Sequence, residues 1–294
     1  MRVHIIANPV SGRGRAARIL PRLEAALREG GGVVEVVRTG GRGDAAAAAR
    51  AAAGADAVVA VGGDGTVNEV LNGLPPGGPA LGVLATGTAN VLAKELGLPR
   101  EPEALARAVR AGRTRAWDVG VRGETGQKFL LMAGAGFDAA IVHGFHATRR
   151  GTIRMSQYLA WGLRYLTCYR HPTLAVEIDG APVPGPVHFA LVNNAAEYGG
   201  PLRLSAGARP DDGVFQVLLF RSPRTRDAGR LYLQAFFASV FDGPLHVPGA
   251  EFRPARRVRI TADDPVPLQI DGDPAGFLPA TLTLHPAAVR LIVP

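Results

Sequence analysis

An aspartate surrounded by small residues, in the segment Gly62-Gly63-Asp64-Gly65-Thr66, is a first candidate for chemistry. Glycines between a strand and a helix leave backbone N–H groups open to an anion, and the first turn of a helix adds partial positive charge. These features suit a phosphate. A carboxylate beside a phosphate repels it unless a divalent cation lies between the two. The segment therefore indicates metal-dependent nucleotide chemistry, and the alternative is a tight turn in which Asp64 is a local cap.

The flanking residues predict a buried strand before this turn and a helix after it. Residues 56–61 are short, apolar and β-branched, which is typical of a parallel strand buried on both faces. Thr66 is expected to cap the following helix. The helix has apolar residues at spacings of three and four: Val67, Val70, Leu71 and Leu74. This order places the predicted phosphate site at the carboxyl edge of a parallel sheet.

Two further acidic motifs lie in the second half of the chain. Asp211 and Asp212 precede a glycine in DDGVFQV, and Asp271 and Asp273 flank Gly272 in LQIDGDP. Carboxylates at glycine turns are candidates for magnesium ligands or for a general base. The alternatives are a solvated carboxylate pair in the first motif and an acidic β-turn in the second.

The composition excludes several classes of protein. The single Cys168 excludes a disulfide scaffold and a cysteine-built zinc site, and it fits a reducing compartment. No apolar stretch approaches the length of a membrane span, and no signal-peptide pattern is present, so the expected location is the cytoplasm. The net charge of +8 comes almost wholly from arginine. Neither lysine, Lys94 or Lys128, lies in a Walker-type phosphate loop.

The pattern of strands and helices changes near residue 120. Before it, strands and helices alternate, which predicts a parallel sheet between helices. After it, short strands are separated by glycine, proline and aspartate, which predicts antiparallel β-structure.

Two more segments complete a recognisable set of motifs: IIANPVSGRGRA after the first strand, and LGVLATGTANVLAKELGLP around a later one. In this order and at these separations, the motifs resemble the diacylglycerol kinase catalytic family. The similarity is greatest to the soluble bacterial lipid kinases, which also include relatives of sphingosine and ceramide kinases. NAD kinases and phosphofructokinases share a segment like Gly62–Thr66, whereas GTANVLAKELGLP and DDGVFQV point to the lipid branch. The resemblance spans nearly the whole chain.

The resemblance implies an NAD kinase/diacylglycerol kinase-like fold. It comprises an α/β ATP-binding catalytic domain over 1–120 and an antiparallel β-sandwich lipid-substrate domain over 121–284, with ATP in the cleft between them. The tail from about 285 to 294 packs back on the first domain. The implied reaction is ATP- and Mg²⁺-dependent phosphorylation of a lipid hydroxyl, of diacylglycerol or a related lipid, in phospholipid metabolism. An NAD kinase-like phosphotransferase and a catalytically impaired nucleotide- or lipid-binding homologue stay open as alternatives.

The site residues follow by matching each motif to the family. The residues expected to line ATP are Asn8, Pro9, Val10, Ser11, Gly12, Thr39, Gly62, Gly63, Asp64, Gly65, Thr66, Val67, Asn68 and Thr88. Asp64 and Asp118 are expected near the catalytic Mg²⁺. Asp212 is expected to bind a second, structural Mg²⁺ together with the backbone carbonyls of Arg209 and Val214.

The chain departs from the family at two positions. Relatives usually have Asp-Gly-Glu at the last motif, whereas this chain has Asp271-Gly272-Asp273, which shortens the second acid by one methylene. Asp273 or Asp271 is the expected general base. Val91 stands where many relatives have an aspartate, which removes one carboxylate near the magnesium network.

The expected partners are ATP and a lipid at a membrane surface. No acidic residue lies between Asp138 and Glu177. Basic and aromatic residues gather there instead: Arg149, Arg150, Arg154, Tyr158, Trp161, Arg164, Tyr165, Tyr169 and Arg170. This favours peripheral contact with an anionic membrane, and the alternative is a helix packed on the β domain with solvated arginines. Nucleic acid is not an expected partner, and a homodimer is kept open.

Overall fold

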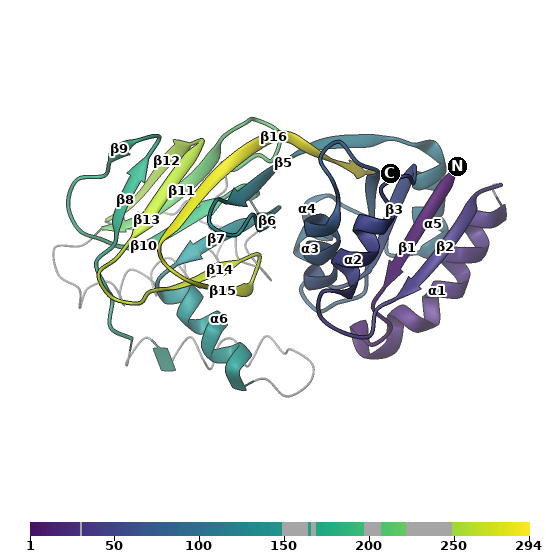
Figure 1. Cartoon of the computed structure of the whole chain (residues 1–294), viewed down its shortest axis with the longest axis horizontal. Coiled ribbons are helices and arrows are strands. Elements are labelled where there is room, and N and C mark those ends of the chain that lie inside the picture. Colours follow the sequence, from purple (N-terminus) through teal and green to yellow (C-terminus); the bar gives the residue numbers. More distant parts are fainter. Residues whose placement is uncertain (30, 149–163, 166–168, 197–206, 222–248) are drawn as a thin grey trace. The chain divides into compact units, whose positions relative to one another are not determined.

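The computed structural model describes residues 1–29, 31–148, 164–165, 169–196, 207–221 and 249–294 (Figure 1). The chain divides into two units, Met1–Val119 with Pro286–Pro294, and Gly120–His285. It passes between them within two strands, β5 (Thr114–Arg122) and β16 (Ala280–Ile292). Over the described ranges, no helix has both the length and the apolar character needed to cross a membrane.

The first unit is built on a parallel sheet in the order β2-β1-β3-β4. The strands are β1 (Arg2–Ala7), β2 (Val33–Arg38), β3 (Ala57–Gly62) and β4 (Ala80–Ala85). Every residue of β3 is buried, as its apolar, β-branched sequence predicts. The end of β16 extends this sheet, because Leu291 pairs in parallel with Leu81 of β4.

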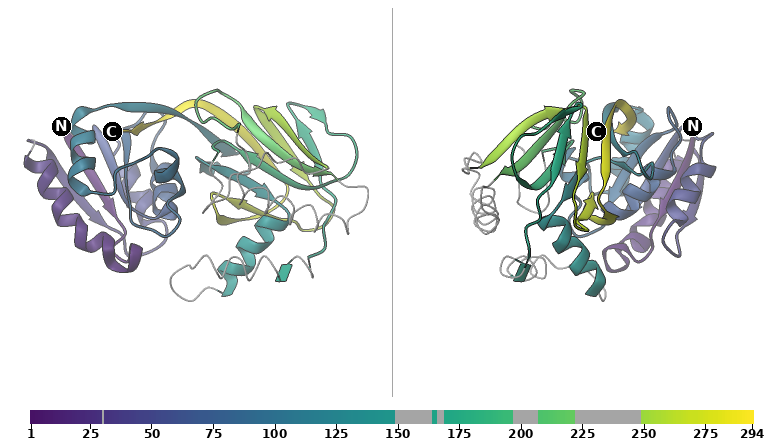
Figure 2. Two further views of the ribbon diagram at one scale, coloured as in Figure 1. Left: turned by 180° about the vertical axis from the view of Figure 1, so that it is seen from behind. Right: turned by 60° about the vertical axis from the view of Figure 1, so that its left-hand side comes forward.

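Helices cover both faces of this sheet (Figure 1, Figure 2). They are α1 (Ser11–Glu29), α2 (Asp44–Ala51), α3 (Asp64–Gly73), α4 (Val91–Glu95) and α5 (Pro102–Ala111). Leucines of α1 and α5, such as Leu23 and Leu105, share one buried cluster with β1 and β3. The helices α2 and α3 pack against each other, so α3 is held between a neighbouring helix and the sheet.

The start of α3 differs from the prediction that Thr66 caps it. The helix begins at Asp64, the N-cap is Gly63, and no side chain caps it. Thr66 is buried inside the first turn, where its N–H donates to the carbonyl of Gly63 at 3.0 Å. A Cβ atom on Gly62 would lie 2.4 Å from the Thr66 hydroxyl oxygen, so the glycine leaves the space that Thr66 fills. The predicted cap was therefore wrong by three residues.

The second unit contains two antiparallel layers. One sheet has the order β12-β11-β10-β7-β14-β15, and the other layer contains the first part of β16 with β13, β8 and β9. The strands are β6 (Lys128–Phe129), β7 (Met132–Ala135), β8 (Ala175–Ile178), β9 (Ala181–Pro182), β10 (Val187–Asn193), β11 (Phe215–Arg221), β12 (Ala250–Ala255), β13 (Arg257–Thr261), β14 (Pro267–Ile270) and β15 (Asp273–Phe277).

An apolar cluster of described residues joins these layers. It contains Val258 and Leu282 from one layer and Val217 and Leu268 from the other. Helix α6 (Phe137–Thr148) packs on β14 and β15. A parallel α/β unit and an antiparallel β-sandwich were the predicted fold class, and that prediction is confirmed.

Candidate functional site

Three loops meet at the carboxyl edge of the parallel sheet in the first unit. They follow β1, β3 and β4, which are neighbours in the sheet. The N–H of Asn8 donates to the carbonyl of Val61 at 2.9 Å, and the N–H of Thr86 donates to that of Gly62 at 2.8 Å. The hydroxyl of Thr86 also donates to that of Ser11 at 2.9 Å. Parallel pairing therefore brings together turns that are far apart in the sequence.

Glycine allows the backbones of these loops to approach closely. A Cβ atom on Gly12 would lie 2.1 Å from the carbonyl oxygen of Thr86. A Cβ atom on Gly87 would lie 2.6 Å from the Cα atom of Gly63. Gly12 also has a φ of 60°, in the region that other residues rarely adopt. The loop surface is thus lined by backbone, which is the chemistry that a phosphate cradle needs.

The structure places most of the predicted ATP residues in these loops. Asn8, Pro9, Val10, Ser11 and Gly12 follow β1 or begin α1; Gly62 ends β3; Gly63 to Asn68 form the turn and the start of α3; and Thr88 lies between β4 and α4. Thr39 follows β2, and its N–H donates to the carbonyl of Ala7 at 2.9 Å, beside the end of β1.

Asp64 has neighbours at the start of α4 that sequence reasoning did not assign. One carboxylate oxygen of Asp64 accepts the N–H of Val91 at 2.8 Å, at the start of α4. Burial raises the pKa of Asp64 above its usual value, and N–H groups of Val91, Asn90 and Leu92 oppose that rise. The side chain of Val91 is buried, so this position contributes a backbone donor where many relatives are expected to carry a carboxylate.

Asn90 presents an oxygen without a hydrogen-bond partner among the described residues. Its amide nitrogen donates to the carbonyl of Gly87 at 2.9 Å, while its Oδ1 is buried and unsatisfied. A buried acceptor of this kind is costly unless something binds it. Asn90 was not among the predicted site residues, although its place after the glycine turn in GTAN was the available signal.

Asp118 has a contact with the C-terminal tail. It is buried in β5, and its Oδ1 accepts the N–H of Ala287 at 2.7 Å. This carboxylate therefore helps to hold β16 in the first unit. Its predicted place near a catalytic metal stays a prediction.

In the second unit, Asp271 anchors the turn between β14 and β15. Its Oδ1 accepts the N–H groups of Leu131 and Met132, both at 3.0 Å, and its Oδ2 accepts that of Leu130 at 3.0 Å. Asp271 has a φ of 49°, which Asp and Asn tolerate better than most residues. Both oxygens of this carboxylate are thus engaged with the backbone that leads into β7.

A second anchor on the same turn passes through Gln269, which is 1% exposed. Its Oε1 accepts the N–H of Gly272 at 2.9 Å, and its Nε2 donates to Oδ2 of Asp138 at 3.0 Å. Asp138 is buried in the first turn of α6, over Gly134, where a Cβ atom would lie 2.2 Å from its Oδ2. Neither Gln269 nor Asp138 was predicted. The available signal was one polar residue in each of two otherwise apolar segments.

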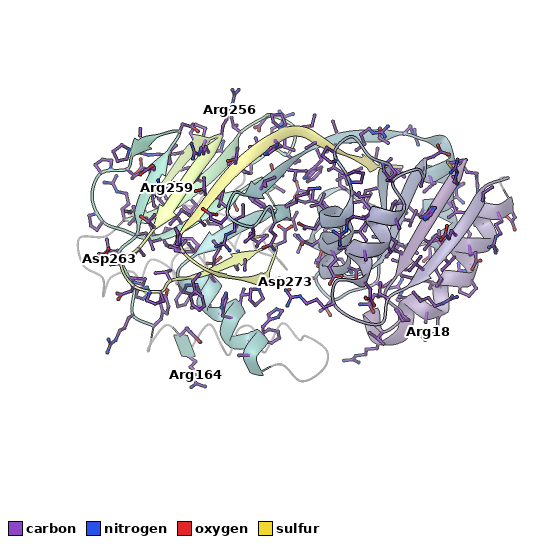
Figure 3. All side chains as sticks on the ribbon, viewed as in Figure 1. Arg18, Arg164, Arg256, Arg259, Asp263 and Asp273 are labelled. Carbon is purple, nitrogen blue, oxygen red and sulfur yellow. The ribbon has the colours of Figure 1, made fainter. Side chains whose placement is uncertain are left out.

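Asp273 is the more accessible acid of the motif. It begins β15 on the hairpin beside α6 (Figure 3), and its side chain is 43% exposed. The Nε2 atom of His146, near the end of α6, lies 3.6 Å from its Oδ1. The structure therefore distinguishes two acids that look alike in the sequence: Asp271 holds the backbone, and Asp273 faces outward.

The predicted structural metal ligands lie on a loop before β11. Oδ1 of Asp212 accepts the N–H of Val214 at 3.1 Å, and Nε of Arg209 lies 3.6 Å from Oδ1 of Asp211. Within the described ranges, no group of three or more His, Cys, Asp or Glu side chains could hold a metal ion. The predicted set relies on one carboxylate and two backbone carbonyls, and it stays a prediction.

Much of the predicted membrane-facing segment lies outside the described residues, including Arg149, Arg150, Arg154, Tyr158 and Trp161. Of the two described tyrosines in its last part, Tyr165 and Tyr169, the second packs inside the second unit. The ring of Tyr169 meets that of Phe137 edge-on at 5.8 Å, and burial raises the pKa of its hydroxyl. At Tyr169, the structure therefore agrees better with the alternative, a segment packed on the β domain, than with contact with a membrane.

Comparisons with known proteins cover nearly the whole chain. Two family models match it: the diacylglycerol kinase catalytic domain over residues 2–121, and the YegS C-terminal NAD kinase beta sandwich-like domain over residues 132–293. The diacylglycerol kinase of Bacillus subtilis (strain 168) is 29% identical over 298 residues, covering 100% of this chain and 96% of that protein. The diacylglycerol kinase of Mycobacterium tuberculosis (strain CDC 1551 / Oshkosh) is 32% identical over 303 residues, covering 100% and 95%.

A solved structure shares the fold. A crystal structure of a diacylglycerol kinase from Bacillus anthracis str. Sterne superposes with a TM-score of 0.74 at 21% identity. The match covers 100% of this chain and 97% of that one.

The anchoring role of Asp271 predicts a loss of stability on Asp271→Asn. We expect the free energy of unfolding in urea to fall by about 2 kcal/mol, because a neutral amide replaces a carboxylate that accepts three backbone N–H groups. Asp273→Asn is the matched control, and it should change that free energy by less than about 0.5 kcal/mol because the side chain is 43% exposed and accepts none of these three backbone N–H groups. Equal losses in the two variants would contradict the distinction between the acids.

The raised pKa of Asp64 predicts a gain in stability on Asp64→Asn. A carboxyl group with a raised folded-state pKa lowers stability as pH rises from its unfolded value through its folded one. Above that range, without metal, the variant should therefore have a higher melting temperature than the wild type. Asp263→Asn, at an exposed position labelled in Figure 3, is the control and should show no such gain. A melting temperature of Asp64→Asn at or below the wild-type value at every pH would refute the assignment.

Proposed function

We propose a specific reaction for this chain, which belongs to the diacylglycerol kinase catalytic-domain family and is a lipid kinase. In this proposal, it transfers the γ-phosphate of ATP to a hydroxyl of diacylglycerol or a close relative. The family resemblance of the motifs is confirmed by both family models. The proposal concerns ATP, Mg²⁺ and the lipid class. It assigns ATP binding to the first unit and lipid binding to the second.

One observation carries the proposal, namely the meeting of three glycine-bearing loops around Asp64. Loops of this kind at the carboxyl edge of a parallel sheet suit the phosphates of a nucleotide. In our proposal, residues Asn8 to Gly12, Gly62 to Asn68 and Thr88 position the triphosphate, and Thr39 lies at the margin.

The donor atoms near Asp64 fit a magnesium ion. Mg²⁺ prefers oxygen ligands, and the site offers the carboxylate of Asp64 and the unsatisfied Oδ1 of Asn90. When bound, the ion supplies neutralisation of phosphate charge. We propose that Asp118 is a further carboxylate near this ion. We also propose that Asp212, with the carbonyls of Arg209 and Val214, forms a structural Mg²⁺ site on the second unit.

We propose Asp273 as the general base. Asp271 has both oxygens engaged with backbone N–H groups, so the exposed Asp273 is the better acceptor of a proton. The lipid O–H bond breaks and its proton passes to the Asp273 carboxylate. The lipid oxygen forms a bond to the γ-phosphorus as the bond to ADP breaks. Because the acceptor is a membrane lipid, the reaction belongs at a membrane surface.

The proposal is tested by incubating the protein with labelled ATP, Mg²⁺ and single acceptors. The acceptors are diacylglycerol, monoacylglycerol, ceramide, sphingosine and phosphatidylglycerol in mixed micelles, and NAD in solution. We expect label in the product of diacylglycerol, and a loss of at least about 100-fold in Asp64→Asn. Label in NAD alone would favour the NAD kinase alternative. A folded wild-type protein that labels nothing would favour a catalytically impaired homologue.

The short acid of the final motif gives a sharper prediction. Asp273→Asn should lower kcat by about 100-fold or more while the KM for ATP changes by less than about twofold. Asp273→Glu should keep or raise kcat, because it restores the length that the family resemblance implies.

Asp271→Asn, assayed at a temperature where it is folded, is the comparison for this prediction. If Asp273→Asn keeps most activity while Asp271→Asn loses it, the base is Asp271. If neither change matters, the acidic pair has no catalytic role.

A further inference from the structure

His146 lies against the acid that we assign as the base. Its Nε2 atom is 3.6 Å from Oδ1 of Asp273, and both residues belong to the second unit. We propose that His146 is a positioning residue for phosphoryl transfer, holding the Asp273 carboxylate where it takes the proton of the lipid hydroxyl. This inference rests on the proposed function.

The relative exposure of the two side chains assigns their roles. The side chain of His146 is 21% exposed and that of Asp273 is 43% exposed, so the imidazole is the more enclosed partner and the carboxylate the more accessible one. The group that meets a substrate is the accessible one. His146 therefore acts through Asp273 and not directly on the lipid.

The helix that carries His146 is fixed to the hairpin at two other points. At its first turn, Asp138 binds Gln269, which in turn binds the N–H of Gly272. One turn before His146, Nε2 of His143 lies 2.9 Å from the carbonyl oxygen of Leu268. Residues three apart lie on one face of a helix, so the anchor at His143 brings His146 to the same hairpin.

His146 is also packed from the side. The ring of Phe145, which is 4% exposed, meets its imidazole edge-on at 5.9 Å. The ring of Phe277 on β15 meets His143 edge-on at 5.4 Å. The first contact limits the space open to the His146 imidazole, and the second adds a further contact between α6 and β15.

A positioning contact matters more for a short acid than for a long one. An exposed aspartate without a neighbour samples several rotamers. All of them except the one that reaches the hydroxyl must be excluded before proton transfer. Misplacement of a catalytic group by about 1 Å can lower the rate about 100-fold. The present separation is longer than a hydrogen bond and within ion-pair range, and such catalytic contacts often tighten when substrate binds.

The test compares two amides that differ only in reach. His146→Gln places an N–H donor near the position of the imidazole Nε2, whereas the shorter side chain of His146→Asn falls about one methylene short. We expect His146→Asn to lower kcat about 10-fold or more with the KM for ATP changed by less than about twofold, and His146→Gln to recover most of kcat. His285→Asn, an exposed histidine on β16, is the control and should match the wild type.

A double-mutant cycle separates positioning from a general structural role. If His146 acts only through Asp273, then His146→Asn has no further effect on the residual kcat of Asp273→Asn. All variants are assayed well below their melting temperatures. Independent losses that multiply in the double mutant, or an unchanged kcat in His146→Asn, would overturn the inference. A wild-type protein that phosphorylates no lipid would overturn the proposed function instead.

Discussion

The geometry of the second unit depends on one carboxylate that accepts three successive backbone N–H groups. Asp271 accepts the N–H groups of Leu130, Leu131 and Met132, at the start of β7, and so fastens the β14–β15 turn to a central strand of the sandwich. Charge-assisted hydrogen bonds of this kind are among the stronger interactions in a protein. Because Gln269 ties the same turn to α6, the position of Asp273 is set by two elements at once.

The first unit reaches its site by a different means. Its loops are brought together by parallel pairing of β1, β3 and β4, and glycine lets them approach closely. Any side chain at Gly12 or Gly87 would collide with the backbone of another loop. The loop surface therefore exposes main-chain atoms, which can approach an anion more closely than bulky side chains allow.

The candidate site of the first unit also retains groups that a fold selected only for stability would remove. Asp64 holds a carboxylate in surroundings that raise its pKa, and Asn90 holds a buried oxygen without a hydrogen-bond partner among the described residues. Each arrangement destabilises the folded chain, and a cation with oxygen ligands would relieve both. That these groups lie on neighbouring loops supports a shared ligand. Strain and unsatisfied groups are commonly retained at functional sites for this reason.

The sequence by itself determined the fold class and the family. Residues 56–61 predicted a buried strand because a short apolar, β-branched run is a local feature of the sequence, and the order of the motifs predicted both domains and a lipid kinase. Local pattern was less reliable at an element boundary, since Thr66 was expected as a cap and lies inside α3. Only the tertiary structure could distinguish Asp271 from Asp273. The partners of Asp271 are 139 to 141 residues away, and those of Gln269 include Asp138 at 131 residues. Contacts over such separations leave no local spacing to read, because the fold and not the neighbouring sequence brings their atoms together.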